Sequence, residues 1–342
     1  MRHCLPLLLL LAALLPACLG GNDRAGQERA PALEPYGRTV RVGYIANGLP
    51  AGIGFVLEEG QLFASQRLPV VFQRYAGPEG LRRALLTSEL DVAVALPLLS
   101  AAKLLEEDTH VVVVAGLQLA EEQVMVPLTS TIQSVADLRG KLVGTPGPGS
   151  SGDLLFWSVL SHGYGFGPAD LRTHVATETQ LVILIESGAV DAVVLRGLTV
   201  AGLPDPSRYR IVSDLPAEWR AATQLDAPPI VATVTMRRGF LDGYPDEAAR
   251  ALAGIILAVR WGRQHPAEVA QLMTRHLRMT QANAHNYARR WPQMWAAVMD
   301  DAAVAAMQLS LERLRSQGLI RQPVPETLFD RALFTRASHY AR

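Results

Sequence analysis

The sequence predicts an α/β fold in which two mostly parallel sheets, each flanked by helices, are followed by a helical C-terminal extension. Short runs rich in β-branched residues alternate with helical segments, a pattern typical of βαβ units. The phrase ALLTSELDVAVAL at 84–96 is also similar to ILIESGAVDAVVL at 183–195, which indicates a weak internal repeat. From Tyr244 onward nearly every segment has a helical pattern. These observations predict two α/β lobes built on one plan, with a helical tail.

The first α/β series extends from residue 39 to residue 117. Its expected strands are 39–46, 68–74, 91–95 and 111–117, and its expected helices are 53–63, 78–87 and 98–105. The strands are apolar and short, and the crossovers between them should be right-handed.

The second series follows the same plan, and the helical tail comes after it. Its expected strands are 141–145, 172–176, 190–195 and, after Arg210-Ile211-Val212, 228–236; its expected helices are 134–139, 154–160 and 179–187. The tail has expected helices at 248–261 and in HPAEVAQLM, TQANAHNYARRW and DDAAVAAMQLSLERLRSQG. Large apolar residues recur there at helical spacing, which predicts core packing rather than an aromatic binding site. They are Trp291, Met294, Trp295, Val298 and Met299.

The composition excludes several classes of function. Of the 342 residues, 49% are hydrophobic and 19% are charged, so the chain can bury the cores of roughly two domains. Lys plus Arg equals Asp plus Glu at 32 each, so no net field attracts nucleic acid or an acidic membrane. We therefore expect a globular protein without a nucleic-acid partner.

The N-terminal residues 1–18 form an expected lipoprotein signal peptide. Arg2 and His3 precede an apolar stretch at 5–15, which is too short to span a bilayer. The sequence then resembles the lipobox of bacterial lipoproteins, which implies that Cys18 is lipidated and anchors the protein to a membrane. The alternative is an ordinary secretory signal with a coincidental cysteine. Residues 19–37 are rich in Gly, Pro, Ala and charge, and we expect them to form a flexible tether.

Motifs of common enzyme classes are missing from the sequence. The mature chain would have no cysteine, because Cys4 lies in the segment that is removed. There is no HExxH, no G-x-S-x-G and no GxxxxGK[ST]. We expect no metal, no cofactor and no catalysis.

Several phrases, in this order, resemble one family. They are VRVGYI, FVLEEGQLFASQRLPVVFQRY, LRRALLTSELDVAVA, SVADLRGKLVGTPGPGSS, LIESGAVDAVVL and WGRQHPAEVAQLM. The chain is similar, over about residues 39–320, to the substrate-binding lipoproteins of ABC transporters in the nitrate, sulfonate, taurine and thiamine-precursor group. The resemblance implies the type II periplasmic binding fold, with one lobe at 38–127 and 228–342, the other at 128–227, and a ligand cleft and hinge between them.

Residues at predicted strand ends are the candidate ligand contacts, since open α/β sheets bind ligands beyond the carboxyl ends of their strands. Trp219, near the predicted return crossing, joins them. The candidates are Asn47, Leu49, Tyr75, Gly77, Leu96, Pro97, Ser150, Ser151, Gly152, Thr177, Thr179, Arg196 and Trp219. The alternative is that several of them only cap helices.

Arg196 and the loop GPGSSGDLLF (147–156) carry two open alternatives. Arg196 is the one cation at a predicted strand end, where it could hold a carboxylate, sulfonate or phosphate; alternatively it pairs with Glu178 or Glu186. In the loop, Ser150 with Asp153 approximates a capping box. Because Asp153 lowers the positive potential of that helix end, we expect a hydrogen-bonding wall rather than a phosphate cradle.

The resemblance implies a monomeric, lipid-anchored protein of the periplasm or cell surface. It would capture a small organic solute, such as a sulfonate, carboxylate or heterocycle, and deliver it to an ABC permease without chemistry. One alternative is a ligand-sensing lipoprotein that signals to a partner. The other is an enzyme of thiamine-pyrimidine or menaquinone type, because these enzymes share the fold.

Overall fold

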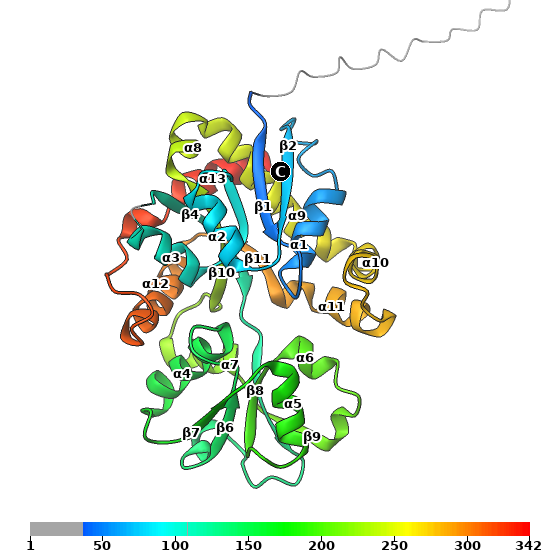
Figure 1. Ribbon diagram of the computed structural model, residues 1–342, viewed down its shortest axis with the longest axis vertical. Coiled ribbons are helices and arrows are strands. Elements are labelled where there is room, and N and C mark those ends of the chain that lie inside the picture. The colour runs from blue at the N-terminus through cyan, green and yellow to red at the C-terminus, as the bar shows by residue number, and fades with distance from the viewer. Residues whose placement is uncertain (1–36, 108) are drawn as a thin grey trace, which may run out of the picture. The chain divides into compact units, whose positions relative to one another are not determined.

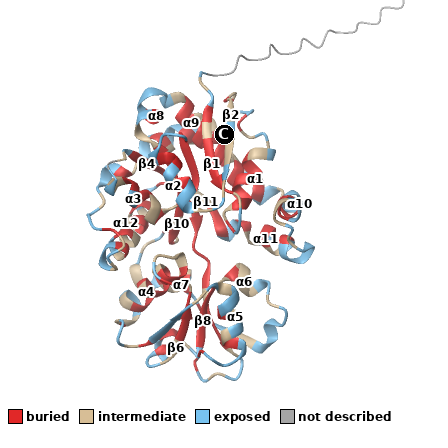
Figure 2. Ribbon diagram, in the orientation of Figure 1, coloured by how far each residue is buried: buried red, intermediate tan, exposed pale blue. Residues whose placement is uncertain are grey.

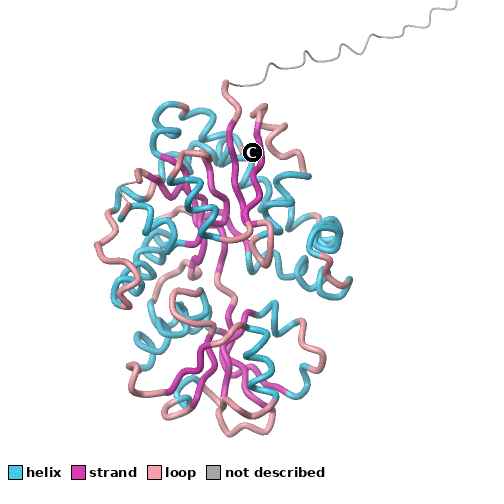
Figure 3. Tube along the Cα trace, in the orientation of Figure 1, coloured by secondary structure: helices cyan, strands magenta, loops and turns pink. Residues whose placement is uncertain are grey.

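A computed structural model describes residues 37–107 and 109–342, which lie in one compact unit formed by residues 35–342. The expected signal peptide, Cys18 and nearly all of the expected tether lie outside the described residues. Within the described unit, two β-sheets with flanking helices are visible in Figure 1, and helices, strands and loops are distinguished in Figure 3. The α/β fold class with two helix-flanked sheets is therefore confirmed.

The first sheet has six strands in the order β11-β4-β10-β3-β1-β2. They are β1 (Val40–Ile45), β2 (Val70–Tyr75), β3 (Val92–Pro97), β4 (Val111–Leu119), β10 (Ile230–Arg237) and β11 (Trp295–Val298). β1 pairs in parallel with β2 and β3, whereas β10 is antiparallel to both β3 and β4. β1 to β4 thus share one direction, which agrees with a mostly parallel sheet.

The second sheet has five strands in the order β7-β6-β8-β5-β9. They are β5 (Glu122–Pro127), β6 (Leu142–Thr145), β7 (Arg172–Val175), β8 (Ala192–Arg196) and β9 (Tyr209–Asp214). β6 is parallel to β7 and β8, and β5 is antiparallel to β8 and β9. β10 and β5 are thus antiparallel to the strands on both of their sides. Each is the first strand that the chain forms after it passes from one sheet to the other.

The two sheets are built on one plan, as the sequence repeat suggests. β2-β1-β3-β10-β4 and β7-β6-β8-β5-β9 have the same spatial order, although β10 follows β4 in the chain whereas β5 precedes β6. Asp91, just before β3, accepts a hydrogen bond from the amide of Arg41 at 3.0 Å, and Asp191, just before β8, accepts one from the amide of Leu142 at 2.8 Å. The repeat therefore records equivalent positions in two sheets.

Besides β9, of which only Arg210-Ile211-Val212 was noted, two strands were not predicted from the sequence. β5 lies in the range that the predicted division assigned to the first lobe, yet it pairs in the five-stranded sheet; the division into lobes itself stays a prediction. β11 lies where the large apolar residues suggested a continuing helix. The helix instead ends at Met294, and Trp295 pairs with Gln118 of β4.

Thirteen helices are assigned among the described residues. Before β10 they are α1 (Ala51–Glu59), α2 (Pro78–Leu86), α3 (Leu98–Glu106), α4 (Ser151–Tyr164), α5 (Glu178–Glu186), α6 (Gly197–Ala201) and α7 (Leu215–Thr223). After it they are α8 (Arg238–Gly243), α9 (Pro245–Gln264), α10 (Pro266–Leu277), α11 (Gln281–Met294), α12 (Asp301–Ser316) and α13 (Arg331–Tyr340). Among the described residues, no helix combines the length and apolarity that crossing a bilayer requires.

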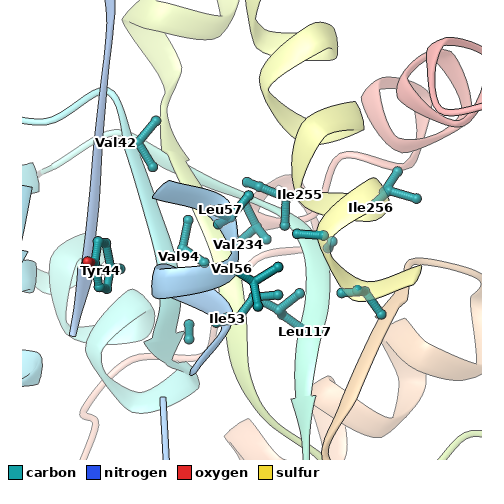
Figure 4. Close-up of a cluster of buried hydrophobic side chains, with 14 of the residues drawn as sticks. Val42, Tyr44, Ile53, Val56, Leu57, Val94, Leu117, Val234, Ile255 and Ile256 are labelled. Carbon is teal, nitrogen blue, oxygen red and sulfur yellow. The ribbon is translucent and has the colours of Figure 1, made fainter. Parts of the chain in front are cut away.

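Alternation along the strands divides the core between the two faces of the six-stranded sheet. Val112 and Val114 of β4 pack with α1 and α9, and Val113 packs with α3 and α12 on the other face. Figure 4 shows Val94, Val234, Ile53 and other members of the first cluster, and the central strands are coloured as buried in Figure 2. The second cluster continues into the five-stranded sheet and α4.

The predicted core role of the large apolar residues near the end of α11 agrees with their burial. Trp291, Met294 and Trp295 have no exposed surface, and Met299 is 3% exposed. Val298 is half-buried and packs against the second cluster.

Candidate functional site

A cavity of about 340 Å³ interrupts the core between the helices of the two sheets. Its apolar wall includes Pro97, Leu98, Leu154, Leu155, Trp219 and Ile230. Its polar groups come from Gln118, Ser100, Ser150, Ser151, Ser158 and Ser310. No residue that lines it, among the described ones, carries a formal charge. A cavity of this size and character is typical of small-molecule sites.

The end of β3 is shaped by an irregular backbone position. Ala95 lines the cavity with φ of 56°, and the pairing between β3 and β10 shifts register beside it. Such irregularities redirect a strand next to binding sites. Pro97 and the first turn of α3 consequently lie against the cavity.

Gly149 lies at the opposite wall and has a structural reason to be glycine. Its φ is 81°, which disfavours other residues. A Cβ there would lie only 3.3 Å from side-chain atoms of both Leu99 and Leu319. The glycine thus lets the loop before α4 approach Leu99 on α3 and Leu319, which follows α12.

A second, polar hollow of about 540 Å³ adjoins the cavity, and Ser150 and Ser151 line both. Gly152, Thr177, Thr179 and Arg196 line it as well, together with Glu178 and Thr199. The N-terminal ends of α4 and α5 therefore face one space.

Ser150 and Thr177 cap helices, as the alternative considered from the sequence proposes. Ser150 Oγ accepts a hydrogen bond from the amide of Asp153 at 3.1 Å, and Thr177 forms a capping box with Gln180. Only half of the box expected for Ser150 is present, because the Asp153 carboxylate accepts a hydrogen bond from Gln317 Nε2 at 3.0 Å instead. These caps fix the helix starts that line the hollow.

Arg196 pairs with Glu178, one of the two partners considered from the sequence. Its Nε donates to Glu178 Oε1 at 2.6 Å, and Thr199 Oγ1 also donates to that carboxylate. Burial opposes the charge of Arg196, but Glu178 outweighs it and raises the pKa of Arg196. The guanidinium therefore lies in the hollow with its charge balanced by a neighbour.

The structure brings some of the predicted residues together and leaves others apart. Pro97, Ser150, Ser151 and Trp219 line the cavity. Asn47, Leu49, Tyr75, Gly77 and Leu96 line neither space; their neighbours Pro50 and Pro78 line the cavity instead. A role of any of these residues in ligand binding stays a prediction.

Local contacts explain why these five residues line neither the cavity nor the hollow. Asn47 donates its side-chain amide to the carbonyl of Ala76, and Tyr75 donates to Gln73 Oε1 at 2.6 Å. Leu49 and Leu96 are buried in the core, and Gly77 is the N-cap of α2.

Two carboxyls at the crossing from β4 to β5 were not predicted. Glu121 accepts hydrogen bonds from Arg290 Nε at 2.8 Å and from the amide of Leu198 at 3.1 Å. Glu122 accepts hydrogen bonds from Ser151 Oγ and from the amide of Glu121. The signal in the sequence is the adjacent pair of acids directly after the apolar strand 111–119.

Burial raises the pKa of both carboxyls above the ordinary value, although Arg290 acts against this for Glu121 and Ser151 acts against it for Glu122. Glu122 is 2% exposed and has no ion pair with a described residue. Burial therefore favours the neutral form of Glu122 more in the folded protein than in the unfolded chain.

We expect Glu122→Gln to stabilise the protein at alkaline pH. Because the folded pKa is raised, the stability associated with the neutral carboxyl is fully present below the unfolded pKa of about 4.3 and is lost as pH rises through the folded pKa. The variant should gain on the order of 1 kcal/mol in unfolding free energy at pH 8, and close to none at pH 4. Urea unfolding at both pH values measures this.

Glu186→Gln, at the exposed end of α5, is the matched control and should change stability little at either pH. A Glu122→Gln variant that is less stable than the parent at pH 8 would contradict the expectation, since it would show that the ionised carboxylate is the favoured form.

Metal ligands do not gather in the described part of the chain. No three His, Cys, Asp or Glu side chains within residues 37–107 and 109–342 form a group that could hold a metal ion. Any binding in the cavity would therefore rest on shape, apolar contact and neutral hydrogen bonds from the residues that line it.

Comparisons with known proteins agree with this architecture. A family model described as menaquinone biosynthesis matches residues 42–313. No curated protein matches the sequence significantly.

Solved structures with the same fold include three binding proteins. The periplasmic aliphatic sulphonate-binding protein SsuA from Escherichia coli has a TM-score of 0.70 at 18% identity, over 84% of this chain and 90% of its own. A putative periplasmic sulfonate-binding protein SsuA from Methylobacillus flagellatus KT has a TM-score of 0.72 at 17% identity, over 90% and 95%. The periplasmic nitrate-binding protein NrtA from Synechocystis PCC 6803 has a TM-score of 0.62 at 15% identity, over 90% and 89%. The expected periplasmic binding protein fold is thus confirmed.

Proposed function

We propose that this chain, which belongs to the menaquinone-biosynthesis family, is an extracytoplasmic solute-binding protein that delivers a small organic molecule to an ABC permease. The fold that it shares with sulfonate- and nitrate-binding proteins supports the proposal. Its solute would be a sulfonate, a carboxylate or a heterocycle held by the cavity and the adjoining polar hollow.

One observation supports the proposal most directly: residues from both sheets, or from the loops and helices next to them, line the cavity of about 340 Å³. Pro97, Gln118 and Ile230 belong to the six-stranded sheet or its loops, and Leu154 and Trp219 belong to helices packed on the five-stranded sheet. A molecule held there contacts both, so its binding is coupled to their relative position. That coupling is what a receptor needs in order to signal its loaded state to a permease.

Uptake by cells tests the proposal. The solute is released from purified protein by denaturation, identified by mass spectrometry and prepared in labelled form. Cells that lack this chain should take up the labelled solute at least tenfold more slowly than cells that have it. Equal uptake by both would reject the delivery role.

We also propose that Cys18 carries a lipid anchor, and the prediction is that Cys18→Ala releases the protein from membranes. A thiol is the attachment point, so its loss removes the acyl chains and the apolar contact with the bilayer. Most of the parent should sediment with membranes and most of the variant should stay in the supernatant. Equal sedimentation of both would contradict anchoring at this residue, and Cys4→Ala should behave like the parent.

A second candidate function is catalysis of a step in menaquinone biosynthesis. The family match favours it, and so does the buried Glu122, which has a raised pKa and is hydrogen-bonded to a serine that lines both spaces. A protonated carboxyl beside a ligand can act as a general acid. Under this alternative, purified protein converts its solute catalytically, and Glu122→Gln lowers the rate at least 100-fold while leaving binding intact.

A further inference from the structure

Two largely buried polar side chains that line the cavity have no hydrogen-bond partner among the described residues. Gln118 of β4 is 9% exposed and Ser158 of α4 is 4% exposed, and both line the cavity. Among residues 37–107 and 109–342, neither the side-chain amide of Gln118 nor the side-chain hydroxyl of Ser158 makes a hydrogen bond to another described group; the hydrogen bonds at Ser158 involve its backbone carbonyl. Since both residues line the cavity, a molecule held there would supply the hydrogen-bond partner that the described residues do not.

Ser310 and Ser161 show that this lack of partners is not general. Ser310, which also lines the cavity, donates its hydroxyl to the carbonyl of Ala306 at 3.1 Å. Ser161, on the same helix as Ser158, donates to the carbonyl of Trp157 at 2.8 Å and lies outside the cavity lining. The free hydroxyl of Ser158 is therefore a local feature of the cavity.

The described groups around the cavity offer no free positive charge to an anion. Ser151 donates to the buried carboxyl of Glu122, and Asp153 places a second buried carboxyl in the first turn of α4. Arg196, which lines the adjoining hollow, is paired with Glu178. The N-terminal end of α4 thus already faces carboxyl groups and the guanidinium of Arg196 is already paired, so an anionic ligand would find no free cation among the described residues that line the two spaces.

The size of the cavity limits the ligand further. An engineered apolar protein cavity of about 150 Å³ holds benzene, and this cavity has about 340 Å³. The space suits two fused rings with a small substituent, with Trp219 and the surrounding leucines and prolines supplying apolar contact.

We infer that the cavity takes an uncharged bicyclic aromatic molecule with one hydrogen-bonding substituent, held by the Gln118 amide and the Ser158 hydroxyl. This inference rests on the proposed function, because it names the chemical class of the captured solute. Among the classes proposed above it selects the neutral heterocycle over the sulfonate and the carboxylate. Gln118 and Ser158 are then the residues that determine specificity.

Two probes with the same rings and different charge test the inference. Indole-5-carboxamide is neutral, whereas indole-5-sulfonate carries a negatively charged sulfonate group. Sulfonates are the ligands for which the structurally similar SsuA proteins are named. Isothermal titration calorimetry with the full chain, freed of bound solute, should show binding of the carboxamide at least tenfold tighter than that of the sulfonate. Equal or tighter binding of the sulfonate would overturn the inference and leave the proposed function standing.

Variants assign the binding to the two side chains. Gln118→Leu and Ser158→Ala should each weaken carboxamide binding by about tenfold, since one hydrogen bond is lost from a buried site. Ser161→Ala, on the same helix but outside the cavity, should leave it within twofold. Unchanged binding in both cavity variants would overturn the assignment and with it the inference.

Stability of the free variant supplies a second readout. Because the Gln118 side-chain amide has no partner within the part of the chain that the structure describes, Gln118→Leu should be at least as stable as the parent without ligand. A clear loss of thermal stability would overturn the inference, since it would mean that the amide is bonded within the fold. Failure of both probes to bind at millimolar concentration would overturn it as well. The proposed function is tested separately by the uptake measurement, and it falls if cells with and without the chain take up the released solute equally.

Discussion

Replacing Asp91 with Asn is expected to lower the free energy of unfolding by about 3 kcal/mol, because it breaks a buried ion cluster. The Asp91 side chain has no exposed surface and pairs with Arg38, Arg41 and Arg237, each at 2.8 Å. Arg41 and Arg237 join the start of β1 and the end of β10 to the start of β3. Loss of the carboxylate leaves three partly buried guanidinium groups without their shared partner. Urea unfolding at pH 7 measures the change.

The same cluster gives stability a defined pH dependence. Burial alone would raise the pKa of Asp91, but hydrogen bonds from Arg41 and Arg237 outweigh it and lower the pKa to about 2. Because the folded pKa is depressed, the contribution is present above the unfolded pKa of about 3.9 and is lost as pH falls toward 2. The difference between parent and Asp91→Asn should therefore be largest near pH 7 and shrink below pH 4.

Asp191→Asn is the matched control, since Asp191 occupies the equivalent position in the other sheet. Asp191 is exposed, and it accepts the amide of Leu142 without an ion pair to a described arginine. We expect Asp191→Asn to lower the free energy of unfolding by less than about 1 kcal/mol. Equal losses in the two variants would show that the backbone hydrogen bond, rather than the arginine cluster, is what stabilises these positions.

Filling the cavity is expected to have the largest effect on binding. Ser310→Trp places an indole in the space of about 340 Å³ and should weaken solute binding at least 100-fold. The fold should survive, because Ser310 lies on α12 with its side chain only partly buried. Calorimetry with the solute released from the parent protein measures the loss.

Ser316→Trp adds the same side chain at an exposed position of α12 outside the cavity lining. It should bind the solute as the parent does. If Ser310→Trp also bound normally while remaining folded, the solute would have to occupy another place, and the cavity would lose its role.

The fold was predictable where local patterns decide it. The strands that carry buried β-branched runs, such as 111–119, are visible in the sequence, and the repeat around Asp91 and Asp191 correctly indicated one plan for both sheets. β5 was missed because EQVMVP begins with two polar residues, and its pairing with β8 and β9 depends on partners far along the chain. β11 was missed because the spacing of its large residues also fits a helix.

The candidate site was predictable only in part, for a related reason. Strand ends mark an edge of a sheet, but the turns after them decide which side chain reaches the cavity. Asn47 is used within the loop to bind the carbonyl of Ala76, and Pro50 lines the cavity instead. Gln118 has no local signal in the sequence, and the acidic pair that contains Glu122 marks a strand end without showing its burial, because the burial of both residues arises where the chain crosses from one sheet to the other.

The most direct test of the account measures, over time, the amount and identity of the solute in a solution of the purified protein. The protein is incubated with a twentyfold excess of the molecule released from it, and both are followed by mass spectrometry. A binding protein should hold one molecule per chain and leave the excess chemically unchanged. Conversion of more solute than there is protein would contradict the account and establish an enzyme, and absence of any bound molecule would contradict the site itself.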